Sequence, residues 1–242
     1  MLKGKKVIIF DMDGTLIDSI GIWNTIDEEV IRTIGNGEID NIDIGKQRDE
    51  KLKEYSKCED IYLEYCGFLK KKYNSNMSKE EIKELRYKIA DKYIRTKIGY
   101  KPNVEKVLKY LKEKSFTLAI ASTTNDFTID IYKNENQNII NKANLEDIFS
   151  LIYSKGAVKE LKPNPEVHYK ILKELNVTKE ECLIIEDSLI GVEAANNANI
   201  EVAVIYDKYS DSNREKINKL SQYQFKDYNE MLKYMKCELE DN

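Results

Sequence analysis

The chain has 242 residues, a length that suits one large domain or a core domain with a smaller second one. Its formal net charge of −4 argues against nucleic acid or an anionic membrane surface as the main partner. His168 is the only histidine, and none of the four cysteines belongs to a Cys-x-x-Cys pair, so a Cys/His zinc site lacks ligands.

The N-terminus leads directly into a short strand-like run, without the pattern of a secretory signal peptide. No apolar stretch reaches the ~18 residues that a membrane-spanning helix needs. We therefore expect a cytoplasmic protein with reduced cysteines, with no membrane and no nucleic acid as partner. A monomer is the default expectation.

Five short apolar runs, rich in valine and isoleucine, are distributed along the chain. Nearly uninterrupted runs of this kind are typical of strands that are buried on both faces of a parallel sheet. The runs are Val7–Phe10, Phe116–Ala121, Leu151–Tyr153, Cys182–Ile185 and Val202–Tyr206.

Helical patterns separate several of these runs. Apolar residues recur at helical spacing from Val104 to Leu111 and again from Val167 to Leu175. Strands that alternate with helices predict an α/β fold with a doubly wound, Rossmann-like parallel sheet at its core.

One stretch interrupts this alternation, because residues 19–96 contain no convincing buried strand. The apolar pattern of Ile82–Tyr93 predicts a helix. Ser78 and Glu81 have the spacing of a capping box just ahead of it. The whole stretch is therefore interpreted as helical.

The helical stretch divides the chain into two predicted domains. Residues 1–18 and 97–242 form the α/β core, and residues 19–96 form an inserted helical cap domain. An insertion after the first strand lies above the carboxyl ends of the strands, where α/β sheets bind ligands.

Polar, reactive residues appear where several of the apolar runs end. Because the carboxyl ends of parallel strands meet at one edge of a sheet, we expect these side chains to share a small volume. They are Asp11 and Asp13 after the first run, Ser122 and Thr123 after the second, Lys162 ahead of a helix, and Glu186 and Asp187 after the fourth.

Four carboxylates in a small volume require a compensating positive charge. Two like charges about 4 Å apart repel by roughly 4 kcal/mol at an effective dielectric constant of about 20. Several such pairs would rival the free energy of unfolding of a whole domain. Mg²⁺ fits, because it takes oxygen ligands from one or two carboxylates, from water and from substrate phosphate. Lys162 supplies a second positive charge.

Two carboxylates and a metal suit phosphoryl transfer. One carboxylate can attack phosphorus to form an aspartyl-phosphate, and the metal orients the phosphoryl group. A second carboxylate can protonate the leaving oxygen and then deprotonate the attacking water. Asp11 and Asp13 are two residues apart, and Gly14 beside them lets backbone amides approach an anion.

At these residues the chain resembles the haloacid dehalogenase-like (HAD) hydrolases, and the resemblance covers residues 5–206. It extends to the subgroup that contains β-phosphoglucomutase and small sugar-phosphate phosphatases. The segments that carry it are Asp11–Ser19, Ser122, Lys162 and Glu186–Asp187 for the four motifs, and Leu161–Tyr169 and Ile184–Ala195 for the subgroup.

The resemblance implies a catalytic pair and a metal site. Asp11 would be the nucleophile and a metal ligand. Asp13 would be the general acid/base and would bind Mg²⁺ through its backbone carbonyl. Glu186 and Asp187 would complete the metal site.

The resemblance also implies how the substrate is held. Ser122 and the amide of Thr123 would bind phosphoryl oxygens, and Lys162 would bridge Asp11 and the phosphoryl group. The helical insertion would be the cap that closes over the substrate and selects it.

The reaction within the family depends on two positions. Haloacid dehalogenases and phosphonatases that resemble this chain lack an aspartate at the position of Asp13, so phosphate esters are favoured. Mutases of the β-phosphoglucomutase type carry a histidine in the first cap helix, where this chain has Trp23. We therefore expect a phosphatase for a small phosphorylated metabolite, especially a sugar phosphate, with a phosphosugar mutase as the alternative. A catalytically idle scaffold that binds a partner is a third hypothesis, which the complete set of motif residues disfavours.

The identity of the substrate is not readable from the sequence. Trp23, Ile20 and a loop around Gly45–Arg48 are candidates to contact it. Trp23 can equally be explained as a residue that packs the cap against the core.

Overall fold

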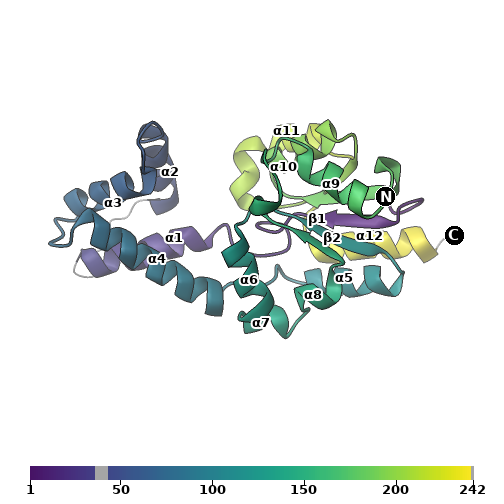
Figure 1. The fold of residues 1–242 in the computed structure, drawn as a ribbon, viewed down its shortest axis with the longest axis horizontal. Coiled ribbons are helices and arrows are strands. Elements are labelled where there is room, and N and C mark those ends of the chain that lie inside the picture. The colour runs from purple at the N-terminus through teal and green to yellow at the C-terminus, as the bar shows by residue number, and fades with distance from the viewer. Residues whose placement is uncertain (36–42, 241–242) are drawn as a thin grey trace. The chain divides into compact units, whose positions relative to one another are not determined.

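The computed structural model describes residues 1–35 and 43–240 (Figure 1). The chain divides into two compact units, one formed by Met1–Ile20 with Ile98–Asn242 and one by Gly21–Lys97. Their boundaries differ from the predicted domain boundaries by one or two residues. That the units act as separate core and cap domains remains a prediction. In the described part of the chain, no helix is both long enough and apolar enough to cross a membrane.

The first unit contains a six-stranded sheet in which every strand pair is parallel. The order of strands is β3-β2-β1-β4-β5-β6. This confirms the predicted doubly wound α/β class with an inserted helical segment. The strands are β1 (Val7–Phe10), β2 (Thr117–Ala121), β3 (Leu151–Tyr153), β4 (Cys182–Glu186), β5 (Glu201–Ile205) and β6 (Tyr223–Phe225). β6 is a strand that was not predicted from the sequence.

The central position of β1 determines where a site can form. β1 lies between β2 and β4, and its last residue, Phe10, pairs with Ile120 on one side and Ile185 on the other. The chain turns one way from β1 to build β2 and β3, and the other way to build β4, β5 and β6. A crevice outside the carboxyl ends of the strands is expected at such a switch point.

Helices cover both faces of the sheet (Figure 1). Figure 1 shows α9, α10 and α11 on one face and α5 and α12 on the other. The helices of this unit are α5 (Val104–Glu113), α6 (Asp126–Asn134), α7 (Gln137–Ile140), α8 (Leu145–Ile148), α9 (Glu166–Glu174), α10 (Leu189–Asn197), α11 (Arg214–Leu220) and α12 (Tyr228–Glu240). Three short 3₁₀ segments are η1 (Lys155–Ala157), η2 (Lys179–Glu181) and η3 (Lys208–Asn213).

Burial of the strands on both faces explains their uninterrupted apolar sequence. On one face, Val7 and Ile9 of β1 pack with Val167 of α9 and Val192 of α10. On the other face, the ring of Phe10 meets that of Phe149 edge-on, with 6.0 Å between ring centres. Because both faces of β1 are packed against other elements, every position of this strand is apolar.

The second unit is helical, as predicted for the insertion. Its helices are α1 (Ile22–Ile34), α2 (Ile44–Glu54), α3 (Ile61–Lys72) and α4 (Lys79–Thr96). The predicted capping box is confirmed, because Ser78 and Glu81 bond each other's backbone amides at the start of α4. Residues 36–42 of the insertion lie outside the described residues.

The segment Gly45–Arg48 was predicted to be a loop, and this is wrong. It forms the first turns of α2, where the side chain of Asp43 accepts a hydrogen bond from the amide of Lys46 and caps the helix. The sequence of α2 is almost entirely polar, so it lacks the apolar repeat by which a helix is recognised.

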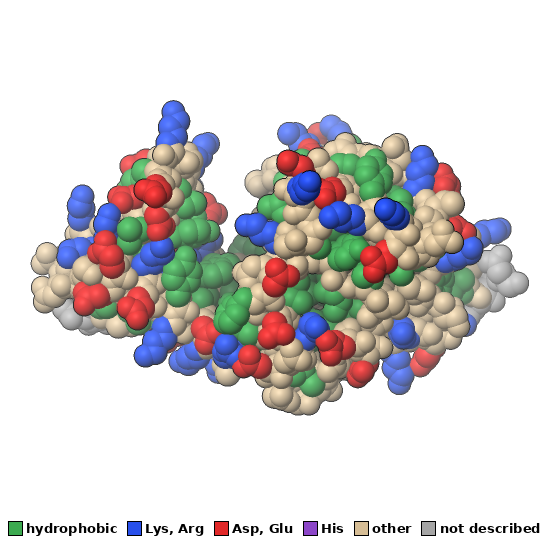
Figure 2. Space-filling model, in the orientation of Figure 1, with side chains coloured by type: hydrophobic (Ala, Val, Ile, Leu, Met, Phe, Trp, Pro, Cys, Tyr) green, Lys and Arg blue, Asp and Glu red, His purple; other side chains and the backbone are tan. Residues whose placement is uncertain are grey.

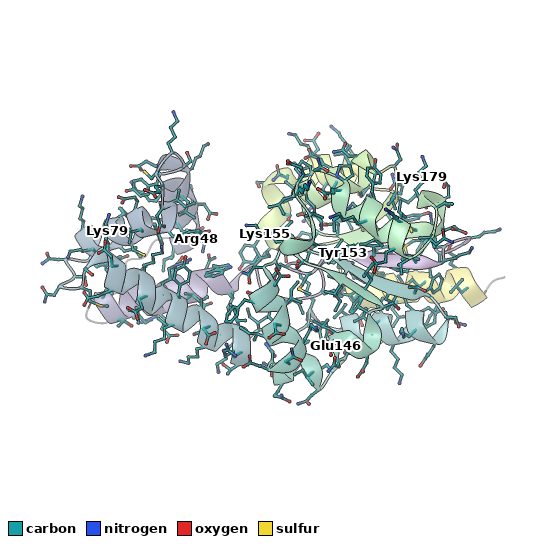
Figure 3. All side chains as sticks on the ribbon, viewed as in Figure 1. Arg48, Lys79, Glu146, Tyr153, Lys155 and Lys179 are labelled. Carbon is teal, nitrogen blue, oxygen red and sulfur yellow. The ribbon has the colours of Figure 1, made fainter. Side chains whose placement is uncertain are left out.

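The core of the second unit encloses a buried ion pair. The guanidinium Nε of Arg86 lies 2.6 Å from Oδ1 of Asp27, and both side chains are buried. Arg48, which Figure 3 labels on this unit, reaches Oδ2 of Asp27 at 3.3 Å. The guanidinium carbon of Arg86 lies 4.7 Å from the ring centre of Trp23. Trp23 thus packs within its own unit, and a contact between Trp23 and substrate stays a prediction.

The two ends of the insertion are tied together by the backbone of the first unit. The amide of Asp18 donates to the carbonyl of Gly99 at 3.0 Å, and the amide of Lys101 donates to the carbonyl of Leu16 at 2.8 Å. Ile17 and Tyr100 form the antiparallel bridge between these bonds.

Candidate active site

The carboxyl edge of the sheet gathers the residues that the sequence singled out. Asp11 follows β1, Ser122 follows β2, and Glu186 is the last residue of β4. The residues that line one cavity of about 200 Å³ are Asp11, Asp13, Ile20, Ser122, Thr123, Lys162, Asp187, Ser188, Ile190, Tyr209 and Ser210. Glu186 is fully buried and lies against this group instead of lining the cavity.

Three carboxylates meet at the base of the site. One oxygen from each of Asp11, Glu186 and Asp187 lies within 4.8 Å of the others, and all three residues are buried. Burial and the negative charge of Glu186 raise the pKa of Asp11 well above its usual range. The same two causes raise the pKa of Asp187 to about 7. The cluster therefore carries repulsion that a cation would relieve.

Lys162 links two of these carboxylates. Its Nζ lies 2.6 Å from Oδ1 of Asp11 and 2.6 Å from Oε1 of Glu186. Burial alone would lower the pKa of Lys162, but the two carboxylates outweigh it and raise that pKa above its usual value. The lysine is therefore charged and positioned against the predicted nucleophile.

Two glycines permit the close approach of these side chains. Gly14 has a φ of +86°, and a Cβ there would lie 2.5 Å from Oδ2 of Asp187. A Cβ at Gly191, in the first turn of α10, would lie 1.9 Å from the carboxyl carbon of Glu186. Any side chain at either position would displace a carboxylate of the cluster.

Hydroxyl groups orient the remaining carboxylates. Thr15 Oγ1 donates to Oδ1 of Asp187 at 2.8 Å. The half-buried carboxylate of Asp13 accepts one hydrogen bond from the hydroxyl of Ser19 and one from the hydroxyl of Thr124. With both oxygens engaged, Asp13 is fixed at the edge of the cavity beside Asp11.

The donor set fits a hard divalent cation. Asp11, Glu186 and Asp187 offer only carboxylate oxygens, which Mg²⁺ prefers over nitrogen or sulfur. Three carboxylates face the single positive charge of Lys162, so one further dication brings the cluster to a small net charge. The residues present therefore fit the Mg²⁺ that the sequence predicts.

The structure also adds residues that sequence reasoning missed. Thr124 and Ser19 lie within quoted motif segments or beside them, but only the fold shows that both contact Asp13. Tyr209 and Ser210 line the cavity from the segment after β5, which carries no motif. Ile20, a predicted candidate for substrate contact, does line the cavity.

The face drawn in Figure 2 gives no sign of a polyanionic partner. Figure 2 shows lysine and arginine side chains interspersed with aspartate and glutamate over the visible face, without a broad area of one sign. A nucleic-acid-binding face would carry a basic patch or stripe.

Comparison with known proteins gives a consistent picture. Residues 8–205 match the family model of the haloacid dehalogenase-like hydrolases. The chain is 26% identical over 199 residues to a phosphorylated carbohydrates phosphatase of Thermotoga maritima. The alignment covers 81% of this chain and 82% of that protein. The chain is also 27% identical over 203 residues to a phosphoglycolate phosphatase of Aquifex aeolicus. This alignment covers 82% of the chain and 84% of the relative.

A solved structure shares the fold at low identity. A T. maritima protein, proposed to be a β-phosphoglucomutase, superposes with a TM-score of 0.72 at 23% identity, over 91% of this chain and 94% of that chain. The family match spans most of this chain and includes the buried cluster of Asp11, Glu186 and Asp187. The chain therefore belongs to the haloacid dehalogenase-like hydrolases and is a phosphatase that acts on phosphorylated small molecules.

Proposed function

We propose that this phosphatase hydrolyses a sugar phosphate or a closely similar metabolite, with Asp11 as the nucleophile, Asp13 as the general acid/base and Mg²⁺ as the cofactor. One observation carries the proposal. Asp11, Asp13, Ser122 and Lys162 line a single small cavity at the switch point of the sheet. A phosphoryl group in this cavity is within reach of a carboxylate nucleophile and of a second, separately held carboxylate.

The first half-reaction transfers the phosphoryl group to the protein. A carboxylate oxygen of Asp11 forms a bond to phosphorus, and the bond from phosphorus to the ester oxygen breaks. Asp13, protonated at this stage, gives its proton to the departing oxygen, so that an alcohol leaves instead of an alkoxide. The hydrogen bonds from Ser19 and Thr124 hold Asp13 at the position of that oxygen.

The second half-reaction restores the enzyme. Asp13, now a carboxylate, takes a proton from water as the water oxygen bonds to phosphorus. The bond between phosphorus and the Asp11 oxygen breaks, which releases inorganic phosphate and regenerates both carboxyl groups in their starting forms. A mutase would differ only at this step, because a sugar hydroxyl would replace the water.

Other groups stabilise the transferred phosphoryl oxygens. The ammonium of Lys162 and the hydroxyl of Ser122 donate to them, together with the backbone amide of Thr123. Asp11, Glu186, Asp187 and the carbonyl of Asp13 would hold Mg²⁺. When bound, the ion supplies positive charge that offsets the charge of the phosphoryl group and of the cluster.

Two observations support the substrate class and the role of the second unit. The T. maritima relative is named for phosphorylated carbohydrates. The helical unit Gly21–Lys97 begins ten residues after Asp11, between β1 and α5, which is where a cap that selects the substrate is expected. Trp23 is our candidate from this unit for contact with the sugar.

The test is phosphate release by the purified protein from p-nitrophenyl phosphate and from a panel of sugar phosphates, with Mg²⁺ and with EDTA. We expect turnover only with Mg²⁺ and a loss of at least about a thousandfold in Asp11→Asn. Asp147→Asn, which changes an exposed aspartate of α8, serves as the control. Undiminished turnover in Asp11→Asn would refute the mechanism, and conversion of β-glucose 1-phosphate to glucose 6-phosphate without phosphate release would identify a mutase.

A further inference from the structure

Two residues outside the family motifs face the cavity from the segment that follows β5. Tyr209 and Ser210 line the same cavity as Asp11 and Lys162. β5 neighbours β4 in the sheet, so its carboxyl end lies beside the end of the strand that supplies Glu186. Tyr209 is 42% exposed, so it is not buried in the core and its ring is available for contact with a ligand.

The backbone of this segment is held by a buried anchor. Asp207 is 5% exposed, and its Oδ1 accepts a hydrogen bond from the amide of Tyr209 at 2.8 Å. Its Oδ2 accepts from the ammonium of Lys101, while Arg214 donates to its backbone carbonyl at 2.7 Å. The backbone that carries Tyr209 and Ser210 is thus held in place without a ligand, which lowers the entropic cost of ordering this segment on binding.

The size of the cavity determines what these residues can meet. At about 200 Å³ it is smaller than the roughly 300–1,000 Å³ of a typical small-molecule pocket. The carboxylates, Ser122 and Lys162 at its base account for a phosphoryl group. The rest of a substrate must therefore meet other lining residues. We call four of these, Ile20, Ile190, Tyr209 and Ser210, the rim, because none of them has a role in the proposed phosphoryl transfer and all are at least partly exposed.

The chemistry of the rim is neutral. Ile20, Ile190 and Tyr209 offer apolar surface, and Ser210 offers a hydroxyl. Among the described residues that line the cavity, Lys162 is the single cation, and it is already paired with Asp11 and Glu186. Lys208 places its ammonium 5.0 Å from the ring centre of Tyr209, but it does not line the cavity.

We propose that Tyr209 and Ser210 form the subsite for the leaving group and that this subsite selects a neutral, hydroxylated one, as in a sugar or polyol phosphate. The proposal rests on the phosphatase function proposed above. The ring of Tyr209 packs against the carbon-bound hydrogens of the sugar or polyol, while Ser210 exchanges a hydrogen bond with one of its hydroxyls. A leaving group that ends in a carboxylate, as in phosphoglycolate, finds no free cation at the rim.

The experiment compares substrates that differ only in the leaving group. The values of kcat/KM are measured with Mg²⁺ for acetyl phosphate, phosphoglycolate, glucose 6-phosphate, ribose 5-phosphate and sorbitol 6-phosphate. We expect the best sugar or polyol phosphate to exceed phosphoglycolate in the unmodified enzyme. In Tyr209→Ala the ratio of kcat/KM for that substrate to kcat/KM for acetyl phosphate should fall about tenfold, mainly through KM.

Conservative and remote variants separate recognition from folding. Tyr209→Phe keeps the ring and should retain most of the ratio, and Ser210→Ala should lower it by itself. Tyr234→Ala removes a tyrosine of nearly equal exposure, 44%, that does not line the cavity, and it should keep the ratio within about twofold.

The outcomes distinguish the two proposals. A ratio that stays within about twofold in Tyr209→Ala, or an equal loss on all substrates, overturns the subsite while leaving the phosphatase intact. A clear preference for phosphoglycolate overturns the neutral selectivity. Absence of phosphate release from every substrate by the unmodified enzyme overturns the proposed function and the subsite together.

Discussion

The ammonium of Lys162 lies 2.6 Å from Oδ1 of Asp11, and the lysine side chain is 3% exposed. One buried cation therefore holds the predicted nucleophile and also bonds to Glu186 behind it. The lysine counteracts burial and the neighbouring carboxylates, which together raise the pKa of Asp11 well above its usual range. Nucleophilic attack needs the ionised form.

Lys162→Met should lower kcat by about a hundredfold to a thousandfold. The variant loses the ammonium that donates hydrogen bonds to the phosphoryl oxygens, and it also loses the counter-ion of Asp11. Steady-state phosphate release measures the effect. Lys179→Met, at the exposed lysine labelled in Figure 3 that precedes β4, should be indistinguishable from the unmodified enzyme. Retention of more than about a tenth of the activity in Lys162→Met would contradict the assigned contact.

Thr124→Val should weaken general acid catalysis by removing one of the two hydroxyls that hold Asp13. We expect kcat/KM for glucose 6-phosphate to fall about tenfold to a hundredfold. The fall should be smaller for p-nitrophenyl phosphate, whose phenolate leaves without a proton. Thr128→Val on α6 is the control, since Thr128 does not line the cavity. Equal losses on both substrates would speak against a role of Thr124 through Asp13.

Asp187→Asn should change the stability of the metal-free protein in a pH-dependent manner. The folded-state pKa of about 7 lies above the ordinary value of an aspartate, so the folded protein binds the extra proton. The corresponding stability is complete below about pH 4 and is lost as the pH rises through about 7. In EDTA the variant should therefore melt higher than the unmodified protein at pH 8 and nearly equally at pH 4.

Addition of Mg²⁺ provides the complementary measurement. At pH 8 the ion should raise the melting temperature of the unmodified protein through linkage, and the rise should be much smaller in Asp187→Asn. Equal rises in both proteins would place the ion elsewhere.

His168 should make stability depend on pH in the opposite direction. Its side chain is fully buried, and both ring nitrogens lack a hydrogen-bond partner among the described residues. Burial, with a smaller contribution from the charge of Lys162, lowers its pKa to about 3. The unfolded chain binds the proton near pH 6.5, so stability is lost as the pH falls from there towards 3. With Mg²⁺ present, His168→Leu should remove up to about 1.4 kcal/mol of this loss per pH unit, as measured by urea unfolding. If the free energy of unfolding changed with pH in the same way in both proteins, the effect of His168 would be excluded.

Arg86→Met should destabilise the helical unit by about 3–5 kcal/mol, because among the described residues it leaves buried Asp27 with only the longer ion-pair contact to Arg48. Loss of helical signal in urea measures the change. Lys79, labelled in Figure 3, forms a half-exposed pair with Glu64 at 2.8 Å, and Lys79→Ala should cost at most about 1 kcal/mol. Similar costs for the two variants would show that burial of the Asp27 pair does not matter.

Much of the fold follows from local pattern. Strands such as Val7–Phe10 are buried on both faces, so their apolar runs are uninterrupted and mark the sheet directly. Most of the motif residues lie at the carboxyl end of a strand or just after it, and parallel pairing brings these ends together. The helix of α4 is equally visible, because its apolar repeat and its capping box are both local.

The remainder depends on contacts that no local pattern encodes. β6 is three residues long and its middle residue is exposed, so its apolar signal is too weak to recognise. The hydroxyl of Thr124 meets Asp13 only because β2 lies beside β1. The backbone of Tyr209 is held near the cavity by Asp207. The partner of Asp207, Lys101, is 106 residues away in the sequence.

The backbone hydrogen bond between Asp18 and Gly99 brings the two ends of the insertion together. Because the chain leaves the first unit and returns to it at hydrogen-bonded neighbours, everything from Gly21 to Lys97 is, in topological terms, one long loop on a closed stem. Such a loop can be lengthened, shortened or exchanged without altering the register of any strand. A chimera that carries another family member's insertion between Asp18 and Gly99 should then keep the chemistry of Asp11 while acquiring a different substrate range.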